Sequence, residues 1–456
     1  MAKYQAYADY KDSGLEWLGE IPSHWKVKKL KYLGEAIIGL TYSPDDVVDE
    51  SEGTLVLRSS NIQNKKLAFE DNVYVRKEIP EKLRTQKNDI LICARNGSRA
   101  LIGKNALIDE SAEGVSFGAF MSIFRSEYNS YLSKVFNSAL FEYQSGTFLT
   151  ATINQLTTGN LNSFEVPLPP LTERNQISNF LDYETRKIDH LIEKQQQLIE
   201  LLKEKRQAVI SHAVTKGLDR NVPMKDSGVE WLGEVPEHWQ TPCTKYLLEI
   251  PITDGPHETP QFVDEGIPFI SAEAIHKGKI NFDKKRGYIK PELNDIYSKK
   301  YSPKLEDIYM VKSGATTGKV AMVETEEKFN IWSPLAVFRC NKIKILPKFL
   351  LAVFNSNHFY DALVLNWSYG TQQNIGMGVL SNIEIPCPPI NEQEEIIQHI
   401  DNELKVFKNL ENKANHAIQL MQERRTALIS AAVTGKIDVR NWQAPTVAEA
   451  QTELSA

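Results

Sequence analysis

The chain repeats itself, and this repetition constrains its fold more than any other feature. The segment at 12–25, Asp-Ser-Gly-Leu-Glu-Trp-Leu-Gly-Glu-Ile-Pro-Ser-His-Trp, returns almost unchanged at 226–239, an offset of 214 residues. Chance does not produce a match of this length, and a repeat indicates that one structural unit has been duplicated in tandem. We therefore expect a pseudo-two-fold protein built from two related halves.

Two further anchors close each half. Residues 164–171 recur at 383–390, and residues 210–219 recur at 429–438, both at an offset of 219. Between the anchors the halves diverge. A common scaffold with variable loops is the pattern of proteins whose loops contact a ligand. Two related but distinct ligands, or two parts of one ligand, are therefore implied.

The divergent middle of each half has the pattern of a mixed α/β domain. Runs rich in β-forming residues at 53–58, 89–93 and 267–270 are separated by Gly, Pro and Asn turns and predict strands. Helical stretches at 131–143 and 347–363 interrupt them. We expect an α/β (α+β) fold in which two such domains alternate with two long helices.

Each half ends in a long helix with a seven-residue apolar pattern. No Gly or Pro occurs from residue 173 to residue 214, and Pro-Pro pairs lie immediately upstream of both helices, with Thr172 and Asn391 as candidate N-caps. The a positions are Leu181, Ile188, Gln195, Leu202 and Val209, then Ile400, Phe407, Ala414, Met421 and Leu428. The d positions are Ile177, Glu184, Leu191, Leu198 and Lys205, then Ile396, Glu403, Leu410, Ala417 and Arg424. This pattern predicts a coiled coil.

Charged d residues select the direction of this coil. A parallel pair in register would bring Glu184 to Glu403 and Lys205 to Arg424, like charge against like. An antiparallel pair in which facing residue numbers add to about 605 places Glu184 beside Arg424 and Lys205 beside Glu403. We therefore predict an antiparallel coiled coil within one chain, with these two charge pairs.

The predicted coil is long enough to act as a spacer. A helix of about 40 residues is about 60 Å long, so the pair could hold two domains apart at a fixed distance. If DNA is the ligand, that distance suits two half-sites roughly one helical turn, or about 34 Å, apart. An ordinary dimerisation coil is the alternative interpretation.

Composition bounds the class of protein. With 456 residues and 41% hydrophobic content, the chain can bury the cores of about three average domains. The four cysteines form no Cys-x-x-Cys pair and no signal peptide is recognisable, so a reducing, cytoplasmic setting is expected. No apolar run approaches the roughly 18 residues that span a bilayer. The net charge of -6 argues against coating nucleic acid by electrostatics alone, so a DNA-binding face would need local Lys and Arg.

A nucleotide site and a methyltransferase site both fail on their motifs. Residues 314–319, Gly-Ala-Thr-Thr-Gly-Lys, are one residue too short between the glycines for a P-loop, and Val320 stands where Ser or Thr should follow. A turn that offers its backbone and Lys319 to a DNA phosphate is favoured instead. Residues 168–171 and 387–390 lack the polar and aromatic residues that flank Pro-Pro in amino-methyltransferases.

Metal-dependent chemistry is not indicated either. Pro44-Asp45 has no Asp/Glu-x-Lys follower of the kind that Mg²⁺ nucleases use, and His257-Glu258 lacks the second His of a zinc protease helix. His24 and His238 lie in the repeated box beside Trp and are interpreted as packing residues. We predict no catalytic residue and no metal site in this chain.

Loops that contact DNA bases need Arg, Lys, Asn, Gln, Ser or Thr, whose side chains hydrogen-bond to base edges. Comparable loops recur in both halves, so the set is better evidence than any single residue. The first-half candidates are Arg58, Ser59, Asn61, Arg95, Asn96, Ser98, Arg99, Thr152, Asn154 and Gln155. The second-half candidates are His257, Lys312, Thr316, Thr317, Lys319, Thr371, Gln372, Gln373 and Asn374.

These motifs resemble the specificity subunits of type I restriction-modification enzymes. The resemblance covers about the whole chain and is carried by the Glu-Trp-Leu-Gly-Glu-Ile/Val-Pro-x-His-Trp box, by residues 167–177, and by residues 203–211 and 423–430. Residues 254–260, Asp-Gly-Pro-His-Glu-Thr-Pro, look like a further loop of the family. The first half departs from that loop and has Gly-Leu-Thr-Tyr-Ser-Pro at 39–44.

The resemblance implies a non-catalytic subunit that binds double-stranded DNA within a site-specific deoxyribonuclease and adenine-specific methyltransferase. Its partners would be two modification subunits, which bind S-adenosylmethionine and methylate adenine N6, and restriction subunits, which use ATP and Mg²⁺. The chain itself would need no cofactor. Because its two domains differ, its target should be bipartite and asymmetric, with unspecified bases between the halves.

On this interpretation the chain divides into five parts. They are a target-recognition domain at 1–168, a spacer helix at 169–218, a second target-recognition domain at 219–387, a second spacer helix at 388–440 and a disordered tail at 441–456. Disorder is expected in the tail because it has little apolar content to bury.

Two other functions stay open. A two-headed coiled-coil adapter would bind two protein partners through its divergent domains, and its DNA affinity would be nonspecific and salt-sensitive. A fused enzyme with an unrecognised active site would show activity as an isolated chain. Neither explains the paired boxes as well as a DNA-binding scaffold does.

Overall fold

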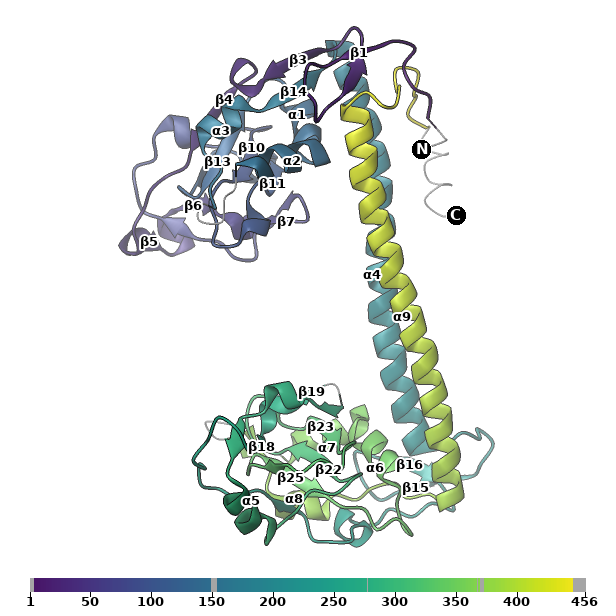
Figure 1. Ribbon diagram of the computed structural model, residues 1–456. Coiled ribbons are helices and arrows are strands. Elements are labelled where there is room, and N and C mark those ends of the chain that lie inside the picture. Colours follow the sequence, from purple (N-terminus) through teal and green to yellow (C-terminus); the bar gives the residue numbers. More distant parts are fainter. Residues whose placement is uncertain (1–3, 149–153, 277, 367, 370–372, 446–456) are drawn as a thin grey trace. The chain divides into compact units, whose positions relative to one another are not determined.

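The computed structural model divides the chain into two compact units (Figure 1). It describes residues 4–148, 154–276, 278–366, 368–369 and 373–445. The first unit is Met1–Gln195 with Asn415–Ala456, and the second unit is Gln196–Ala414. The first unit is therefore built from both ends of the chain, and each long helix contributes one part to each unit.

The first unit is organised around a four-stranded antiparallel sheet in the order β11-β10-β13-β4. Its strands, in that order, are Asn105–Leu107, Ile90–Cys93, Met121–Arg125 and Glu35–Ile38. Side chains alternate between the two faces of a strand. Ile90 and Ile92 enter a core shared with helix residues, and Leu91 and Cys93 enter a second core shared with other strands. The sheet is thus the middle layer of this unit.

A second group of strands covers the face that carries Leu91 and Cys93. In the order β12-β6-β9-β5 they are Ser116–Phe117, Thr54–Leu57, Tyr74–Val75 and Val47–Val48. The pair β12 and β6 is parallel, and the other pairs are antiparallel. Short antiparallel pairs complete the unit: β1 and β2 (Tyr10–Asp12, Glu20–Pro22), β3 and β14 (Lys26–Lys29, Glu165–Leu168), and β7 and β8 (Ile62–Gln63, Lys66–Leu67).

The second unit repeats this architecture. Its antiparallel sheet, in the order β17-β25-β22-β23, is Thr253–Asp254, Leu335–Phe338, Ile308–Val311 and Val320–Met322. The covering strands β21, β18 and β24 are Gly287–Ile289, Ile267–Ile270 and Asn330–Ile331. Two hairpins are β19 with β20 (Ile275–His276, Lys279–Ile280) and β26 with β27 (Ser368–Tyr369, Gln373–Asn374). The strands predicted at 53–58, 89–93 and 267–270 are present as β6, β10 and β18.

A buried ion pair stands at the same place in both sheets. Asp89 accepts two hydrogen bonds from Arg125, at 2.9 and 2.7 Å, and Asp307 accepts two from Arg339, both at 2.7 Å. The hydrogen bonds from Arg339 to Asp307 raise the pKa of that guanidinium above its ordinary value. The repeated Asp-Ile sequence ahead of β10 and β22 therefore has a structural cause.

Among the described residues, the three short helices of the first unit correspond in order to the last three of the four short helices in the second unit. They are α1 (Asn129–Phe136), α2 (Ala139–Thr147) and α3 (Thr158–Ser163) in the first unit, and α5 (Pro291–Ser298), α6 (Pro347–Phe354), α7 (Asn357–Leu365) and α8 (Met377–Asn382) in the second. The stretches predicted to be helical at 131–143 and 347–363 are helical, and a short break divides each into two helices, α1 with α2 and α6 with α7. Asn137 and Asn355 end the first helix of each pair and hydrogen-bond back to main-chain carbonyls, and Ser356 caps α7.

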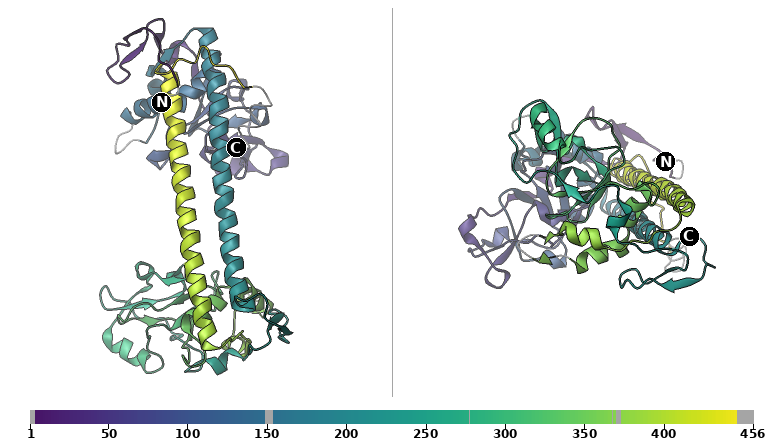
Figure 2. Two further views of the ribbon diagram at one scale, coloured as in Figure 1. Left: turned by 90° about the vertical axis from the view of Figure 1, so that its right-hand side faces the viewer. Right: turned by 90° about the horizontal axis from the view of Figure 1, so that it is seen from below.

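The two long helices run in opposite directions, as predicted. They are α4 (Leu171–Lys216) and α9 (Ile390–Val433). In the first unit, Leu181 near the start of α4 shares a core with Val433 at the end of α9. In the second unit, Val214 near the end of α4 shares a core with Ile396 near the start of α9. The views in Figures 1 and 2 agree that the two helices lie side by side within each unit.

The N-caps predicted at Thr172 and Asn391 were wrong. Both helices begin one residue earlier, and Arg174 N already donates to Pro170 O at 2.9 Å in the first turn of α4. A proline is compatible with the start of a helix because the first N–H groups have no partner inside the helix. Thr172 and Asn391 therefore lie inside the first turns.

Only one of the two predicted apolar columns forms the seam between the helices. The a residues Leu181, Ile188, Leu202, Ile400, Phe407 and Ala414 are buried. The d residues Leu191, Leu198 and Leu410 are exposed. Charged d residues such as Glu184 and Lys205 would lose hydration if this column were buried. Turning the column toward solvent avoids that cost, and the d column is fully buried only near the ends, at Ile177 and Ile396.

The ion pairs between the helices differ from those predicted. Arg425 Nε lies 2.9 Å from Asp189 Oδ1 in the first unit. The predicted pairs, Glu184 with Arg424 and Lys205 with Glu403, are not among the ion pairs of the residues that the structure describes. Because the d column turns outward, Lys205 and Arg424 are exposed, whereas Glu184 is half-buried beside Tyr4.

A serine in each long helix holds the start of a short helix in the same unit. Ser430 Oγ of α9 accepts from Ala139 N, the first residue of α2, at 3.0 Å. Ser211 Oγ of α4 accepts from Asn357 N, the first residue of α7, at 2.9 Å. The first N–H groups of a helix need such outside acceptors. This contact explains the Ile-Ser anchor shared by 210–219 and 429–438.

Replacing Ser211 by alanine is expected to destabilise the second unit by about 1 kcal/mol, since one helix N–H loses its acceptor. Hydrogen exchange of peptides from α7 should accelerate while peptides of the first unit keep their rates. Ser430→Ala should give the mirror result, with faster exchange in α2. Equal acceleration in both units for either variant would contradict this role.

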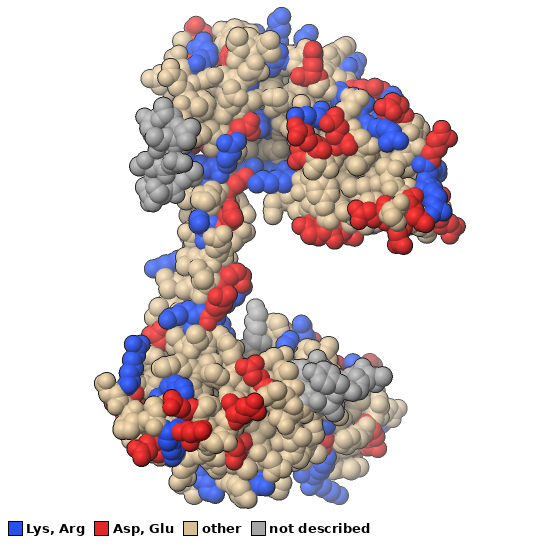
Figure 3. Space-filling view, turned by 180° about the vertical axis from the view of Figure 1, so that it is seen from behind, with Lys and Arg blue, Asp and Glu red and all other residues tan. Residues whose placement is uncertain are grey.

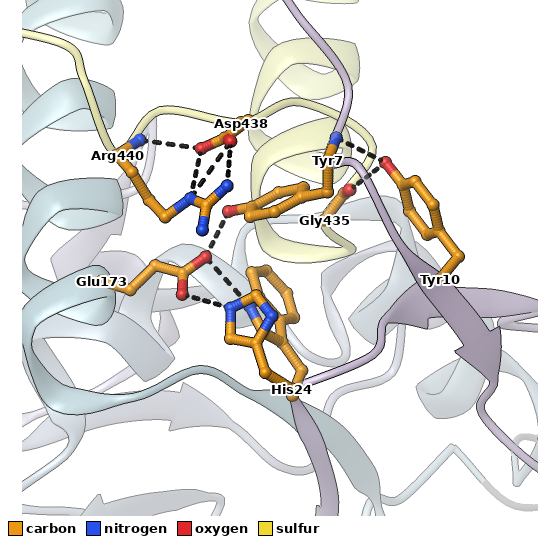
Figure 4. Close-up of polar contacts among 8 residues, drawn as sticks. Tyr7, Tyr10, His24, Glu173, Gly435, Asp438 and Arg440 are labelled. Carbon is orange, nitrogen blue, oxygen red and sulfur yellow. Dashed lines mark hydrogen bonds and ion pairs between the residues drawn. The ribbon is translucent and has the colours of Figure 1, made fainter.

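The repeated box joins the start of one long helix to the end of the other (Figure 4). In the first unit, Glu173 in the first turn of α4 is buried and accepts from Trp25 Nε1 at 3.0 Å and from Tyr7 Oη. His24 Nε2 lies 2.8 Å from the second oxygen of the same carboxylate. Burial, together with the hydrogen bond to Glu173, raises the pKa of Tyr7, so this hydroxyl remains a donor. His24 is thus a hydrogen-bonding residue and not simply a packing residue.

The same junction recurs in the second unit with fewer partners. Glu392 in α9 accepts from Trp239 Nε1 at 3.0 Å and lies 2.8 Å from His238 Nε2. Gly217 follows α4 with φ +75°, a conformation that favours glycine, and a Cβ there would lie 3.2 Å from Glu392 Oε1 and 3.3 Å from Trp239 Cζ2. Each box therefore fixes the point at which its unit receives both long helices.

Chain-end segments complete the junction of the first unit. Tyr10 Oη donates to Gly435 O at 2.9 Å, and Asp438 N donates to Gln5 O at 2.7 Å. Arg440 lies over the ring of Tyr7, 5.0 Å from its centroid (Figure 4). The first and last described segments are thus parts of one junction.

The tail predicted at 441–456 lies partly outside the described residues, from 446 onward. Within the described part, Trp442 packs edge-on against Phe180, with ring centroids 5.5 Å apart. The packed chain therefore extends at least to Trp442.

Candidate nucleic-acid interface

The three loops predicted in the first half come together beyond the end of β10. Arg95 forms a β-bridge with Gln155, and Asn96 Nδ2 donates to Ser59 Oγ at 3.2 Å. The loops at 58–61, 95–99 and 154–155 thus form one surface, which we call the first loop cluster. Sequence spacing alone did not place these loops together.

The second unit brings its predicted loops together in the same way. Ser313 forms a β-bridge with Asn374, and Ile375 N donates to Lys312 O at 2.8 Å. His257 and Lys312 both lie within ion-pair distance of Asp254. The loops at 254–257, 312–319 and 373–374 form the second loop cluster.

The two clusters occupy equivalent places but carry different side chains. The bridge between Arg95 and Gln155 corresponds to the bridge between Ser313 and Asn374, each just beyond the central strand of its sheet. Base edges are distinguished by the donors and acceptors that meet them. Equivalent frames with different side chains are therefore suited to contact two different base sequences.

Several predicted residues are exposed to solvent. The exposed candidates are Arg95, Ser98 and Arg99 in the first cluster and His257, Lys319 and Asn374 in the second. Asn96, Asn154, Gln155, Lys312 and Thr316 are half-buried. Arg99 donates weakly to Gly146 O at 3.4 Å, which leaves most of its guanidinium available.

Other predicted residues serve the loops themselves. Asn61 is buried, and its amide donates to Ala68 O at 3.0 Å and to Asn72 Oδ1 at 3.1 Å. Thr317 is buried and donates to Gly314 O at 2.7 Å. Arg58 is bound by Asp71 at 2.9 Å, and Ser59 holds Asn96. In this structure Asn61 and Thr317 shape loops and do not present themselves to a ligand.

The segment at 314–319 is a turn between antiparallel strands. Gly318 N donates to Val311 O at 2.8 Å, and β23 follows Lys319 directly. A P-loop requires a helix at this point, whose N-terminal N–H groups hold phosphate. The turn instead presents the exposed Lys319 at the edge of the second cluster.

Three candidates, Thr152, Thr371 and Gln372, lie outside the described residues. Gln373 lies in β27, where it pairs with Tyr369. For all four, a DNA contact stays a prediction.

An aromatic residue in the first cluster was missed by the sequence reasoning. Phe120 is 61% exposed, and the Arg95 guanidinium lies over its ring, 5.3 Å from the centroid. Arg95 N also donates to Phe120 O at 2.9 Å. A search restricted to polar side chains could not find it, although a bulky aromatic in a Gly-Ala-Phe turn beside buried strands was a usable signal. Apolar contact with bases is a recognised part of DNA recognition.

Charges are mixed on the surface of each unit. On the face shown in Figure 3, Lys and Arg side chains alternate with Asp and Glu over both units. Among the described residues, no group of three or more His, Cys, Asp or Glu side chains could hold a metal ion. None of the helices in the described parts is both long and apolar enough to span a bilayer.

Comparison with known proteins assigns this arrangement to a family. Residues 22–201 and 239–420 each match the type I restriction modification DNA specificity domain. The chain belongs to this family. The two matches reflect the duplication, and together they cover both loop clusters.

Relatives match along nearly the full length. The specificity subunit of the type I restriction enzyme EcoKI from Escherichia coli is 23% identical, over 93% of this chain and 92% of that protein. The StySPI specificity subunit from Salmonella potsdam is 24% identical over the same shares. A solved chain from a study of assembly and conformational transition of a type I R-M system has a TM-score of 0.63 at 14% identity, covering 91% of this chain and 98% of that one. This last likeness supports the fold.

Proposed function

We propose that this specificity subunit recognises a bipartite, asymmetric DNA target, with one loop cluster contacting each half. The observation that carries the proposal is the pair of equivalent β-bridges, Arg95 with Gln155 and Ser313 with Asn374, each of which sets different polar side chains in the same frame. Two frames of one kind with different side chains suit two different half-sites. Unspecified bases would separate those half-sites.

The proposal includes a scaffold for partner subunits. Exposed leucines on α4 and α9, among them Leu191, Leu198 and Leu410, support it because apolar side chains that stay exposed in the single chain can be buried against a partner. Two modification subunits would use the pseudo-two-fold repeat, and restriction subunits would join them. S-adenosylmethionine, ATP and Mg²⁺ would bind in those partners, while this chain supplies sequence recognition and no catalytic group.

Co-expression with its modification subunit tests this proposal. Single-molecule sequencing should detect N6-methyladenine in a split, asymmetric motif when this chain is present and no such motif when it is deleted. The control is a strain that expresses the modification subunit without this chain. Methylation that is absent in both cases, or identical in both, would refute the proposal and favour a two-headed protein adapter.

A further inference from the structure

A buried carboxylate in the second loop cluster gathers three basic side chains. Asp254 in β17 is 1% exposed, and Lys300 Nζ lies 2.5 Å from its Oδ1. Lys312 Nζ and His257 Nε2 lie 3.3 and 3.1 Å from its Oδ2. One carboxylate thus faces two ammonium groups and an imidazole, and the cluster carries excess positive charge at the pH at which lysines are charged.

Asp254 does not take up all the N–H donors of these basic groups. Although Lys312 and His257 are within ion-pair distance of Oδ2, that buried oxygen has no hydrogen-bond partner of acceptable geometry. A lysine ammonium has three N–H donors, so Lys312 retains donors that a single carboxylate oxygen does not take. Lys300 and His257 are 50% and 71% exposed, so a ligand from solvent can reach the same donors.

The main chain around Asp254 is fixed by a close backbone approach. A Cβ on Gly255 would lie 2.0 Å from Ile331 O, so only glycine allows this loop to pass so near β24. Lys312 is held from the other side, because its N donates to Pro334 O at 2.8 Å. Asp254 lies in β17 and Lys312 directly follows β22, so both residues are held by the sheet, whereas Lys300 follows α5 and His257 lies in the loop after β17.

In the described part of the first unit, the equivalent positions do not carry this arrangement. In the second unit, Asp254 of β17 pairs with Ala336 of β25. At the equivalent place in the first unit, Ile38 of β4 pairs with Ser122 of β13, so an isoleucine replaces the aspartate. Ala94, whose N donates to Phe120 O, takes the place of Lys312. The feature therefore belongs to the second unit and not to the scaffold shared by both.

We propose that Lys300, Lys312 and His257 bind one backbone phosphate of the half-site contacted by the second unit, with Asp254 as the residue that positions them. This inference rests on the DNA-binding function proposed above. A phosphodiester carries one negative charge and two free oxygens, which matches several converging cationic donors. Lysine acts as a point charge suited to phosphate, whereas paired base contacts are typical of Arg, Asn and Gln.

The ionisation of Asp254 agrees with a positioning role. Its burial alone would raise its pKa, but the hydrogen bond and charge of Lys300 and the charge of Lys312 outweigh burial and hold the pKa below its ordinary value. Asp254 therefore remains charged at neutral pH and keeps the lysines near one another, where their mutual repulsion would otherwise separate them.

Salt dependence of DNA binding tests the proposal. The complex of the full chain with its modification subunit is titrated with duplex DNA that contains the target sequence found by sequencing. The binding affinity is measured at several salt concentrations. Lys300→Met combined with Lys312→Met should weaken binding about tenfold. It should also make the slope of log affinity against log salt less steep by about 0.9, the value for one lost phosphate contact. Lys348→Met, an exposed lysine of α6 paired with Asp401, is the matched control and should change neither quantity.

Single methylphosphonate substitutions then locate the phosphate. One uncharged linkage in the second half-site should weaken binding of the unmodified protein and have no further effect on the double lysine variant. The proposal would be overturned if the double lysine variant kept the salt slope of the unmodified protein. It would also be overturned if each uncharged linkage weakened binding of that variant as much as it weakens binding of the unmodified protein.

The lysine variants leave a buried charge and could unfold the unit, so a second variant removes that charge as well. Asp254→Asn combined with Lys300→Met and Lys312→Met leaves no buried charge at this site, and it should fold and show the same loss of slope. If the unmodified complex itself shows no preference for its motif, the proposed function fails. If it binds specifically and the slopes do not change, only the phosphate contact fails.

Discussion

Replacing Glu173 by alanine is expected to destabilise the first unit by about 3–5 kcal/mol, the cost of breaking a buried, charged hydrogen-bond group. The fully buried Trp25 indole and the buried Tyr7 hydroxyl would both lose their acceptor. Each unsatisfied buried donor costs about 1–3 kcal/mol. The measurement is urea unfolding followed by hydrogen exchange on peptides of each unit, since two units need not unfold together.

Glu392→Ala is the matched comparison for this prediction. The equivalent carboxylate holds only Trp239 and His238 and is 22% exposed, so its removal should cost less, about 1–2 kcal/mol. Glu173→Gln, which retains an acceptor for Trp25, should fall between the unmodified chain and Glu173→Ala. Similar losses for Glu173→Ala and Glu392→Ala would show that the extra contacts of Tyr7 contribute nothing.

The repeat made much of the scaffold predictable. Duplicated anchors indicated two related halves, two mixed α/β domains and two antiparallel helices, because the same residues must perform the same packing in both halves. Their particular roles were not predictable. Glu173 and Glu392 each lie about 150 positions from the box residues they bind, and no local pattern encodes a contact over that distance.

The seam between the long helices shows where periodicity fails. The heptad pattern identified Leu181 and Phe407 as buried, but it treated a and d alike. Which column faces inward depends on the cost of burying charge at Glu184 and Lys205 and on what the globular parts cover. The heptad pattern shows which residues share a face of a helix, but it does not show which face is buried.

The sequence predicted the types of residue in the loop clusters, but it did not predict that the loops lie together in the fold. Composition selected Arg95, Asn96 and His257 as candidate DNA contacts, and the fold brings them into the clusters, whereas the side chain of Asn61 is used by the fold itself. Phe120 was missed because it is apolar. Lys300 follows a short helix and lies 46 positions from Asp254, so only the folded chain brings the two together.

Under the proposed function, Arg95→Ala combined with Phe120→Ala should reduce methylation of the target about 100-fold, since each contact with a base contributes about 1–3 kcal/mol. Arg95 is exposed and stacked on Phe120, so the pair presents a cation and an apolar ring from one place in the first cluster. The residual methylated motifs should be relaxed at positions of one half-site only, because the second cluster is unchanged.

Arg76→Ala controls for the loss of an exposed arginine in the same unit, because Arg76 is paired with Glu52 and lies outside the first cluster. The Arg76→Ala variant should methylate the same bases in both half-sites as the unmodified protein does. Loss of specificity in both half-sites would mean that the two units do not contact DNA independently. An unaltered motif at full methylation would place base recognition elsewhere in the first unit. The pattern of relaxation, more than its size, is decisive, since a variant that merely unfolds the unit lowers methylation at every site without changing the motif.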